Sequence, residues 1–118
     1  MKILSYSDLH LEFGVALTLP SDSQADVLIL AGDILTFINY TPLSRLLAHW
    51  RKPVLFTAGN HEYYHSAPLQ EANAEFRQWL AQHHPQVRFL QDEATEIDGV
   101  QFFGGTMWTD FDSANSRA

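Results

Sequence analysis

The chain has 118 residues, of which 46% are hydrophobic and 13% aromatic, and this is enough apolar material to bury the core of one domain. Its 14 acidic and 7 basic residues give a formal net charge of −7. A sequence-independent grip on a nucleic-acid backbone requires the opposite sign, so nucleic acid is not favoured as a bulk partner. The absence of cysteine excludes disulfides and thiolate metal sites, so any metal must bind through oxygen and imidazole.

The apolar stretches of the chain are short. The opening residues 1–4 are followed by Ser5 and soon by Asp8, so they are too short for the hydrophobic region of a secretory signal. No later run approaches the length of a membrane span. The sequence therefore predicts a soluble, cytoplasmic protein without membrane contact.

The first part of the chain is predicted to form two strands and a helix. Residues 2–7 have the pattern of a strand, whereas residues 15–19 are compatible with either a short strand or a loop. Residues 26–31 form a continuous apolar run, which is typical of a strand covered on both faces. Thr41 and Pro42 then predict the start of a short amphipathic helix with Thr41 as its N-cap.

Residues 54–57 are predicted to form the third strand. A strand, a helix and a strand in this order make a βαβ unit, so the second and third strands should be parallel with a right-handed crossover. A second helix is expected over residues 67–82, with Ser66 as its cap. Three short strands follow at 87–90, 94–97 and 100–103, and Asp98-Gly99 predicts a type I′ hairpin turn between the last two.

Polar side chains follow each of the first three predicted strands. Asp8 and His10 follow the first, Asp33 follows the second, and Asn60 and His61 follow the third. Because the carboxyl ends of parallel strands meet at one edge of a sheet, these side chains are expected to lie together. Carboxylate and amide oxygens suit hard divalent cations and imidazole suits borderline ones, so the sequence predicts a metal site at this edge.

A glycine comes directly before two of these polar segments. Gly32 precedes Asp33, and Gly59 precedes Asn60, where the chain must turn sharply out of a strand. We therefore expect a positive φ at both glycines, because glycine reaches that region without steric cost.

Three segments, taken together, resemble the first three motifs of the calcineurin-like metallophosphoesterases. They are residues 7–10 (Ser-Asp-Leu-His), 31–34 (Ala-Gly-Asp-Ile) and 58–62 (Ala-Gly-Asn-His-Glu), in the order and spacing of the family. Residues 104–111 are similar to a segment found downstream in many bacterial members. The resemblance covers essentially the whole chain and suggests a member similar to bacterial serine/threonine phosphatases.

The resemblance implies an α/β fold, namely a metallophosphoesterase-type β-sandwich flanked by helices. Residues 1–118 would form a single, incomplete domain that holds the N-terminal, βαβ-containing part. Two further family motifs, a lone histidine and Gly-His-x-His, do not follow Phe111. We therefore expect either a fragment of a longer protein or a chain that self-associates through an uncovered apolar face of its sheet.

The same resemblance implies a two-metal phosphoesterase. Asp8 and His10 would ligate the first cation, Asp33 would bridge both, and Asn60 would ligate the second. A hydroxide that bridges the metals would attack a phosphomonoester or phosphodiester substrate, and His61 would protonate the leaving oxygen or hold the phosphoryl charge. Manganese is the expected metal, with iron, zinc, cobalt or nickel as alternatives.

Some alternatives remain open in the sequence. The absent histidine motifs are also compatible with a non-catalytic binding or scaffold module that holds at most one metal weakly. Glu62 could orient His61, or it could be a favourable charge ahead of a helix N-terminus. His83 and His84 are expected to end the second helix and not to replace the missing ligands, because neighbouring side chains at a helix end point in different directions.

Overall fold

The computed structural model describes residues 1–11, 19, 24–63 and 68–106. Strands and helices alternate along the chain before a final hairpin: β1 (Ile3–Tyr6), β2 (Val27–Ala31), α1 (Thr41–Leu46), β3 (Val54–Thr57), the 3-10 helix η2 (Asn60–Tyr63), α2 (Leu69–His83), β4 (Val87–Phe89), β5 (Glu93–Ile97) and β6 (Val100–Gly104). The alternative strand at 15–19 falls almost entirely outside these residues, and so does the predicted cap Ser66. Within the described ranges, no helix has the length and apolar character needed to cross a membrane.

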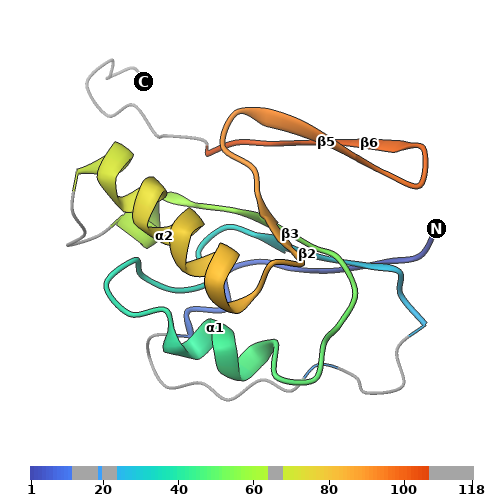
Figure 1. The fold of residues 1–118 in the computed structure, drawn as a ribbon, viewed down its shortest axis with the longest axis horizontal. Helices are drawn as coiled ribbons and strands as arrows, with labels where there is room; N and C mark the ends of the chain where they lie inside the picture. The colour runs from blue at the N-terminus through green and yellow to red at the C-terminus, as the bar shows by residue number, and fades with distance from the viewer. Residues whose placement is uncertain (12–18, 20–23, 64–67, 107–118) are drawn as a thin grey trace.

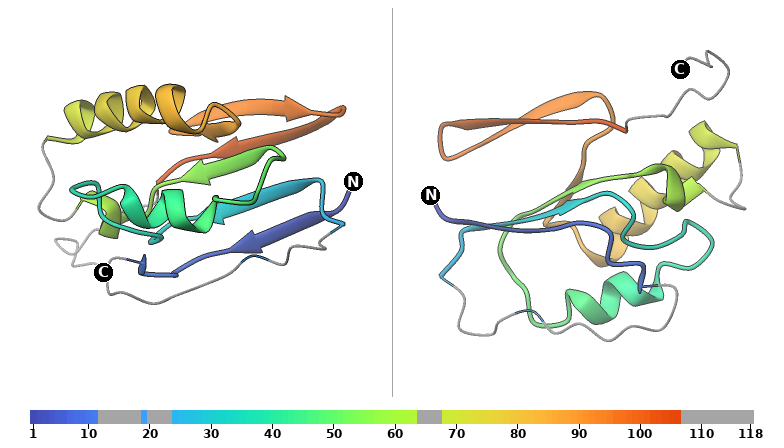
Figure 2. Two further views of the ribbon diagram at one scale, coloured as in Figure 1. Left: turned by 60° about the horizontal axis from the view of Figure 1, so that its bottom comes forward. Right: turned by 180° about the vertical axis from the view of Figure 1, so that it is seen from behind.

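Four strands form one parallel sheet in the order β1-β2-β3-β4 (Figure 1). The expected parallel pairing of β2 with β3 is confirmed, and Ile29 at the centre of β2 lies beside Ser5 of β1 and Leu55 of β3. Because the strands all point the same way, their carboxyl ends lie along one edge of the sheet (Figure 2). This edge is where the polar segments begin.

The two faces of the sheet are covered by different elements. The helices α1 and α2 lie on one face, and the β5–β6 hairpin lies over the other (Figures 1 and 2). Leu28 of β2 belongs to the larger core on the helix side, whereas Val27 packs with Leu55, Leu90 and Ile97 on the hairpin side. Val27 and Leu28 are both 0% exposed. The expectation of a strand covered on both faces is therefore confirmed for β2.

Helix α1 ends at Leu46, although Leu43, Leu46, Leu47 and Trp50 recur at a spacing that predicts a helix as far as Trp50. It begins at Thr41 with Pro42 in its first turn, and Tyr40, which makes no side-chain cap hydrogen bond, holds the N-cap position. The prediction of Thr41 as the cap is therefore wrong by one residue. Leu47 and Trp50 lie beyond the end of α1 but are still buried, because the turns that follow the helix keep them against the core.

Aromatic side chains connect α2 to the sheet. Phe76 of α2 is 0% exposed, and its ring centroid lies 4.6 Å from Phe37, 5.1 Å from Phe56 and 5.1 Å from Phe89. Phe37 belongs to the loop after β2, while the other two rings come from β3 and β4. This aromatic cluster therefore holds α2 against both the sheet and the loop that carries Asp33. Leu69 has the helical spacing of the buried residues Ala72, Phe76 and Leu80, which predicts a place on the same face of α2, but it is 41% exposed.

The hairpin forms as predicted. Strands β5 and β6 pair antiparallel, and the turn residues Asp98 and Gly99 have φ values of 51° and 80°. Positive φ at both central residues is the requirement of a type I′ turn, so this prediction is confirmed. The hairpin covers part of the sheet face that we expected to lie open, while Ile3 on the edge strand β1 remains 48% exposed.

Candidate metal centre

The segment after β1 runs beside the segment after β2 beyond the ends of both strands. The backbone N–H of Asp8 donates to the carbonyl of Gly32 at 3.0 Å, and that of His10 donates to the carbonyl of Asp33 at 3.1 Å. The alignment of the two strands is thus carried into the loops. As a result, Asp8 and His10 are held next to Asp33.

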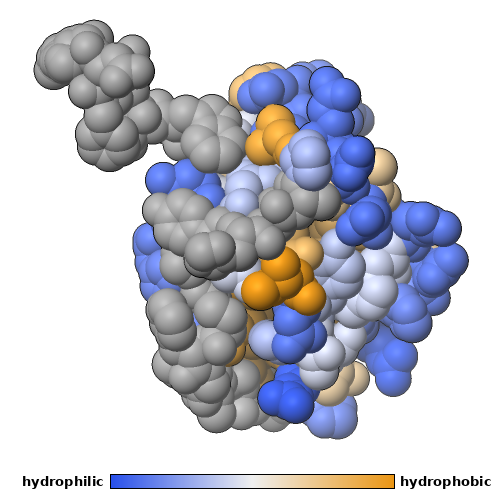
Figure 3. All heavy atoms as spheres, turned by 90° about the vertical axis from the view of Figure 1, so that its left-hand side faces the viewer, coloured by the Kyte–Doolittle hydropathy of each residue, from blue (hydrophilic) through white to orange (hydrophobic). Residues whose placement is uncertain are grey.

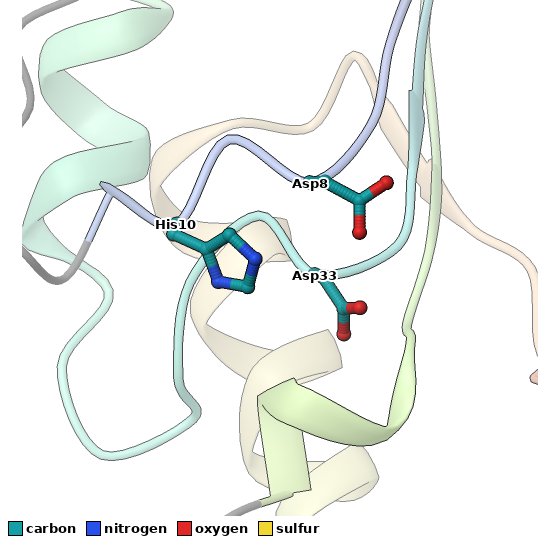
Figure 4. A group of neighbouring side chains, drawn as sticks. All are labelled: Asp8, His10 and Asp33. Atoms are coloured by element: carbon teal, nitrogen blue, oxygen red, sulfur yellow. The ribbon is translucent and has the colours of Figure 1, made fainter.

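The side chains of Asp8, His10 and Asp33 converge from these two loops (Figure 4). Each offers a ligand atom, and these atoms all lie within 4.8 Å of one another. Two atoms bonded to one cation at about 2.0–2.2 Å can be at most about 4.4 Å apart, so small side-chain rotations would suffice to bind an ion. Two carboxylates and an imidazole suit divalent cations such as manganese or zinc. The structure therefore brings three of the four predicted ligands into one candidate metal-binding group.

All three residues of this group have a left-handed backbone. The φ values are 56° at Asp8, 48° at His10 and 54° at Asp33. Asp and His enter this region more readily than most residues, yet it still costs on the order of 1 kcal/mol at a residue with a Cβ. Strained residues of this kind gather at functional sites, where the surrounding structure holds them in place.

Two glycines bring the strand-end loops into contact. Gly32 has a φ of +89°, as predicted, but Gly59 does not have a positive φ, so the prediction is wrong there. Space, not backbone freedom, requires glycine at position 59. A Cβ added to Gly59 would lie 2.4 Å from Oδ1 of Asp33 and 2.9 Å from the Asp33 backbone nitrogen. The loop after β3 therefore touches the Asp33 side chain directly.

Asn60 and His61 follow this contact. Asn60, the fourth predicted ligand, is the first residue of η2 and directly follows Gly59. Its side chain is half-buried. His61 is the second residue of η2, and its side chain lies outside the described part of the structure. Its catalytic role stays a prediction.

Glu62 has a role that neither interpretation of the sequence anticipates. The residue is 0% exposed. Its Oε1 accepts hydrogen bonds from the backbone N–H groups of Asp33 at 2.9 Å and Gly59 at 2.7 Å, and its Oε2 accepts from Ile34 at 2.5 Å and Leu35 at 3.0 Å. Burial raises the pKa of the Glu62 carboxyl, while the four N–H groups act in the opposite direction. Because these donors are backbone groups, no pattern of side chains in the sequence reveals them.

The histidines at the end of α2 lie apart from this group. Nε2 of His84 is 2.9 Å from Oγ of Ser44 in α1, and burial, followed by the neighbouring His83, lowers the pKa of His84. Among the described residues, neither histidine belongs to a candidate metal-binding group.

The glycine-rich segment at the end of β6 is attached to the end of β3. Oγ1 of Thr57 donates to the carbonyl of Gly105 at 3.0 Å, and Oγ1 of Thr106 donates to the carbonyl of Ala58 at 2.6 Å. The start of the segment 104–111 therefore runs beside the residues that lead to Gly59. The rest of that segment, from residue 107 onwards, lies outside the described residues.

The face of the molecule at which the strands end is largely polar where the structure describes it. Hydrophilic residues there surround small, separate groups of apolar residues (Figure 3). Asp8 is exposed, and His10 and Asp33 are half-buried. The candidate metal centre is therefore accessible to a hydrated ion from solvent.

In this chain, two carboxylates and an imidazole lie together at the carboxyl ends of the strands of a parallel sheet. This arrangement is typical of α/β proteins that bind divalent metal ions. The family model of the calcineurin-like phosphoesterases matches residues 1–112, and the chain belongs to this family. Membership of a phosphoesterase family suggests a hydrolase. The chain is also 28% identical, over 135 aligned residues, to the uncharacterized protein L509 of Acanthamoeba polyphaga mimivirus. That match covers 99% of this chain and 48% of the relative, so the chain spans about half the length of the curated relative it matches.

Proposed function

We propose that the chain carries the site of a metal-dependent phosphoesterase that hydrolyses phosphomonoesters or phosphodiesters with two divalent cations. The supporting observation is the group of Asp8, His10 and Asp33, whose ligand atoms lie within 4.8 Å of one another in a member of a phosphoesterase family. In this proposal Asp8 and His10 hold the first cation, Asp33 holds both, and Asn60 holds the second. Manganese is the first candidate metal, and a phosphatase similar to the bacterial serine/threonine enzymes is the finer hypothesis.

The residues of the chain hold the reacting groups in place. When bound, two such cations lower the pKa of water and neutralise the charge that develops on the phosphoryl oxygens. The Asp33 carboxylate is oriented by its own backbone, whose N–H donates to Glu62 and whose carbonyl accepts from His10. We assign His61 as the proton donor to the leaving oxygen.

The protein, supplied with Mn²⁺, is expected to hydrolyse an aryl phosphate ester. Asp33→Ala and His61→Ala should each lower kcat/KM by about 100-fold or more, because one removes the shared metal ligand and the other removes the acid. His49→Ala is the matched control, since His49 is an exposed residue after α1 and its loss should leave turnover unchanged. Unchanged turnover in Asp33→Ala would contradict the bridging role.

The second candidate function is a non-catalytic module with at most one weakly bound metal. It is favoured by the observation that, within the described ranges, the acidic and imidazole donors gather at a single position. Elemental analysis after dialysis separates the two candidates. Two retained metals per chain would exclude the module, whereas one or none, together with no turnover, would contradict the enzyme.

We also propose that the chain self-associates through apolar surface on the hairpin side of the sheet. Ile3 is 48% exposed, Val100 40% and Phe103 73%, and large exposed apolar side chains favour association. Sedimentation velocity is expected to detect a concentration-dependent dimer, and Phe103→Glu should weaken its affinity about tenfold or more. A wild-type chain that sediments as a monomer at every concentration would refute this proposal.

A further inference from the structure

A single buried carboxylate connects the two loops that carry the proposed second metal site. Asp33 lies in the loop after β2, and Asn60 follows Gly59 in the loop after β3. The side chain of Glu62 accepts from Asp33, Ile34 and Leu35 on the first loop and from Gly59 on the second. A fifth hydrogen bond runs from the backbone N–H of Phe37 to the carbonyl of Glu62 at 2.8 Å. One residue thus ties both loops.

Each oxygen of this carboxylate has a different effect. Oε1 joins the N–H of Asp33 to that of Gly59, and therefore bridges the two loops at the point where they touch. Oε2 receives Ile34 and Leu35, and holds the turn that follows Asp33. Hydrogen bonds to a charged acceptor are about twice as strong as neutral ones, and a buried N–H group that loses its partner destabilises the structure. The hydrogen bonds to Glu62 therefore stabilise Asp33 in its left-handed conformation.

We propose that Glu62 is a positioning residue for metal binding, which sets the distance between the Asp33 carboxylate and the Asn60 amide through the backbone of both loops. This inference rests on the proposed function, because it takes these two side chains to be ligands. Glu62 itself makes no bond to the metal in this proposal. Its effect on a cation is exerted through the geometry of Asp33 and Asn60.

Glu62→Gln tests the proposal with the shape of the side chain preserved. An amide offers one acceptor oxygen, so two of the four N–H groups must lose their partner in either orientation of the side chain. For the full chain, we expect the Mn²⁺ dissociation constant, measured by calorimetry on folded protein, to rise at least about tenfold. Excess Mn²⁺ should restore aryl phosphate turnover in Glu62→Gln but not in Asp33→Ala.

Tyr63→Phe is the matched control in the same short helix. The Tyr63 hydroxyl donates to Oδ1 of Asn73 in α2 at 2.6 Å and also interacts with the side chain of Thr106, so its removal weakens the fold but leaves in place all four N–H groups that donate to Glu62. The variant should be less stable than wild type and bind Mn²⁺ with affinity within about twofold of it, as expected for a contact outside the site. Folded Glu62→Gln with wild-type Mn²⁺ affinity would overturn the positioning role.

A measurement on the wild-type chain covers the case in which Glu62→Gln does not fold. Diamagnetic Zn²⁺ should shift the NMR resonances of the backbone amides of Asp33, Ile34, Leu35 and Gly59 together with that of the Asn60 side-chain amide. The four backbone amides donate to the Glu62 carboxylate, and the Asn60 side chain is a proposed ligand of the ion. Zn²⁺ that shifts Asn60 but leaves these amides unmoved would overturn the inference. A wild-type chain that binds neither Mn²⁺ nor Zn²⁺ would overturn the metal assignment itself.

Discussion

Gly59→Ala is expected to weaken metal binding strongly while leaving most of the fold in place. The added Cβ would lie 2.4 Å from Oδ1 of Asp33, so this carboxylate must leave the position that it holds beside Asp8 and His10. The same Cβ would lie 2.9 Å from the Asp33 backbone nitrogen, so the loop must also shift and strain its bond to Glu62. Overpacking of this kind costs about 1–3 kcal/mol of stability, which most domains survive.

Calorimetric titration with Mn²⁺ measures this effect. We expect the affinity of Gly59→Ala to fall about 100-fold or more, which corresponds to about 2.7 kcal/mol. Gly99→Ala is the matched control, because Gly99 has a φ of +80° but nothing lies within 4 Å of an added Cβ. It should cost about 1 kcal/mol of stability through strain in the hairpin turn and leave Mn²⁺ affinity unchanged. Equal affinities in Gly59→Ala and wild type would refute the contact between the loops as a determinant of the site.

Much of the fold could be predicted from hydrophobic patterns and turn chemistry. The continuous apolar run of β2 indicates burial on both faces, and Asp98-Gly99 specifies the hairpin turn, because these signals depend only on neighbouring residues. Element ends were harder to predict. Thr41 is a good cap by composition, yet helix α1 starts one residue earlier, since Pro42 can occupy either of the first helical positions and the tertiary contacts decide.

Only the side-chain ligands of the candidate site could be predicted from the sequence. Asp8, His10 and Asp33 stand at strand ends in the sequence, and parallel pairing of the strands is enough to bring them together. The function of Glu62 depends on backbone N–H groups, which every residue except proline carries, so no residue pattern marks it. The need for glycine at position 59 likewise arises from the approach of Asp33, a contact between loops that are distant in the sequence.

Phe76→Ala is expected to produce the opposite outcome to Gly59→Ala, with a large loss of stability and a preserved site. Phe76 is 0% exposed and packs against Phe37, Phe56 and Phe89, and truncation of a buried phenylalanine costs about 3–5 kcal/mol. That is a large part of the 5–15 kcal/mol typical of a domain. Urea unfolding should therefore place the midpoint of the variant far below that of wild type, whereas Leu69→Ala, in the first turn of the same helix and 41% exposed, should change the free energy of unfolding by only about 0.5 kcal/mol.

Gly59→Ala and Phe76→Ala together distinguish the candidate metal group from the aromatic cluster that stabilises its loops. Phe37 follows Asp33 in the loop after β2, and Phe56 precedes Gly59 at the end of β3. The aromatic cluster therefore stabilises the segments that carry both loops. At a low temperature where Phe76→Ala is still folded, its Mn²⁺ affinity should stay within about threefold of wild type, because the contacts of Asp33 with Glu62 and Gly59 are unaltered. A folded Phe76→Ala chain that has lost Mn²⁺ binding would mean that the loops depend on α2 for their geometry, and that Glu62 alone does not hold them.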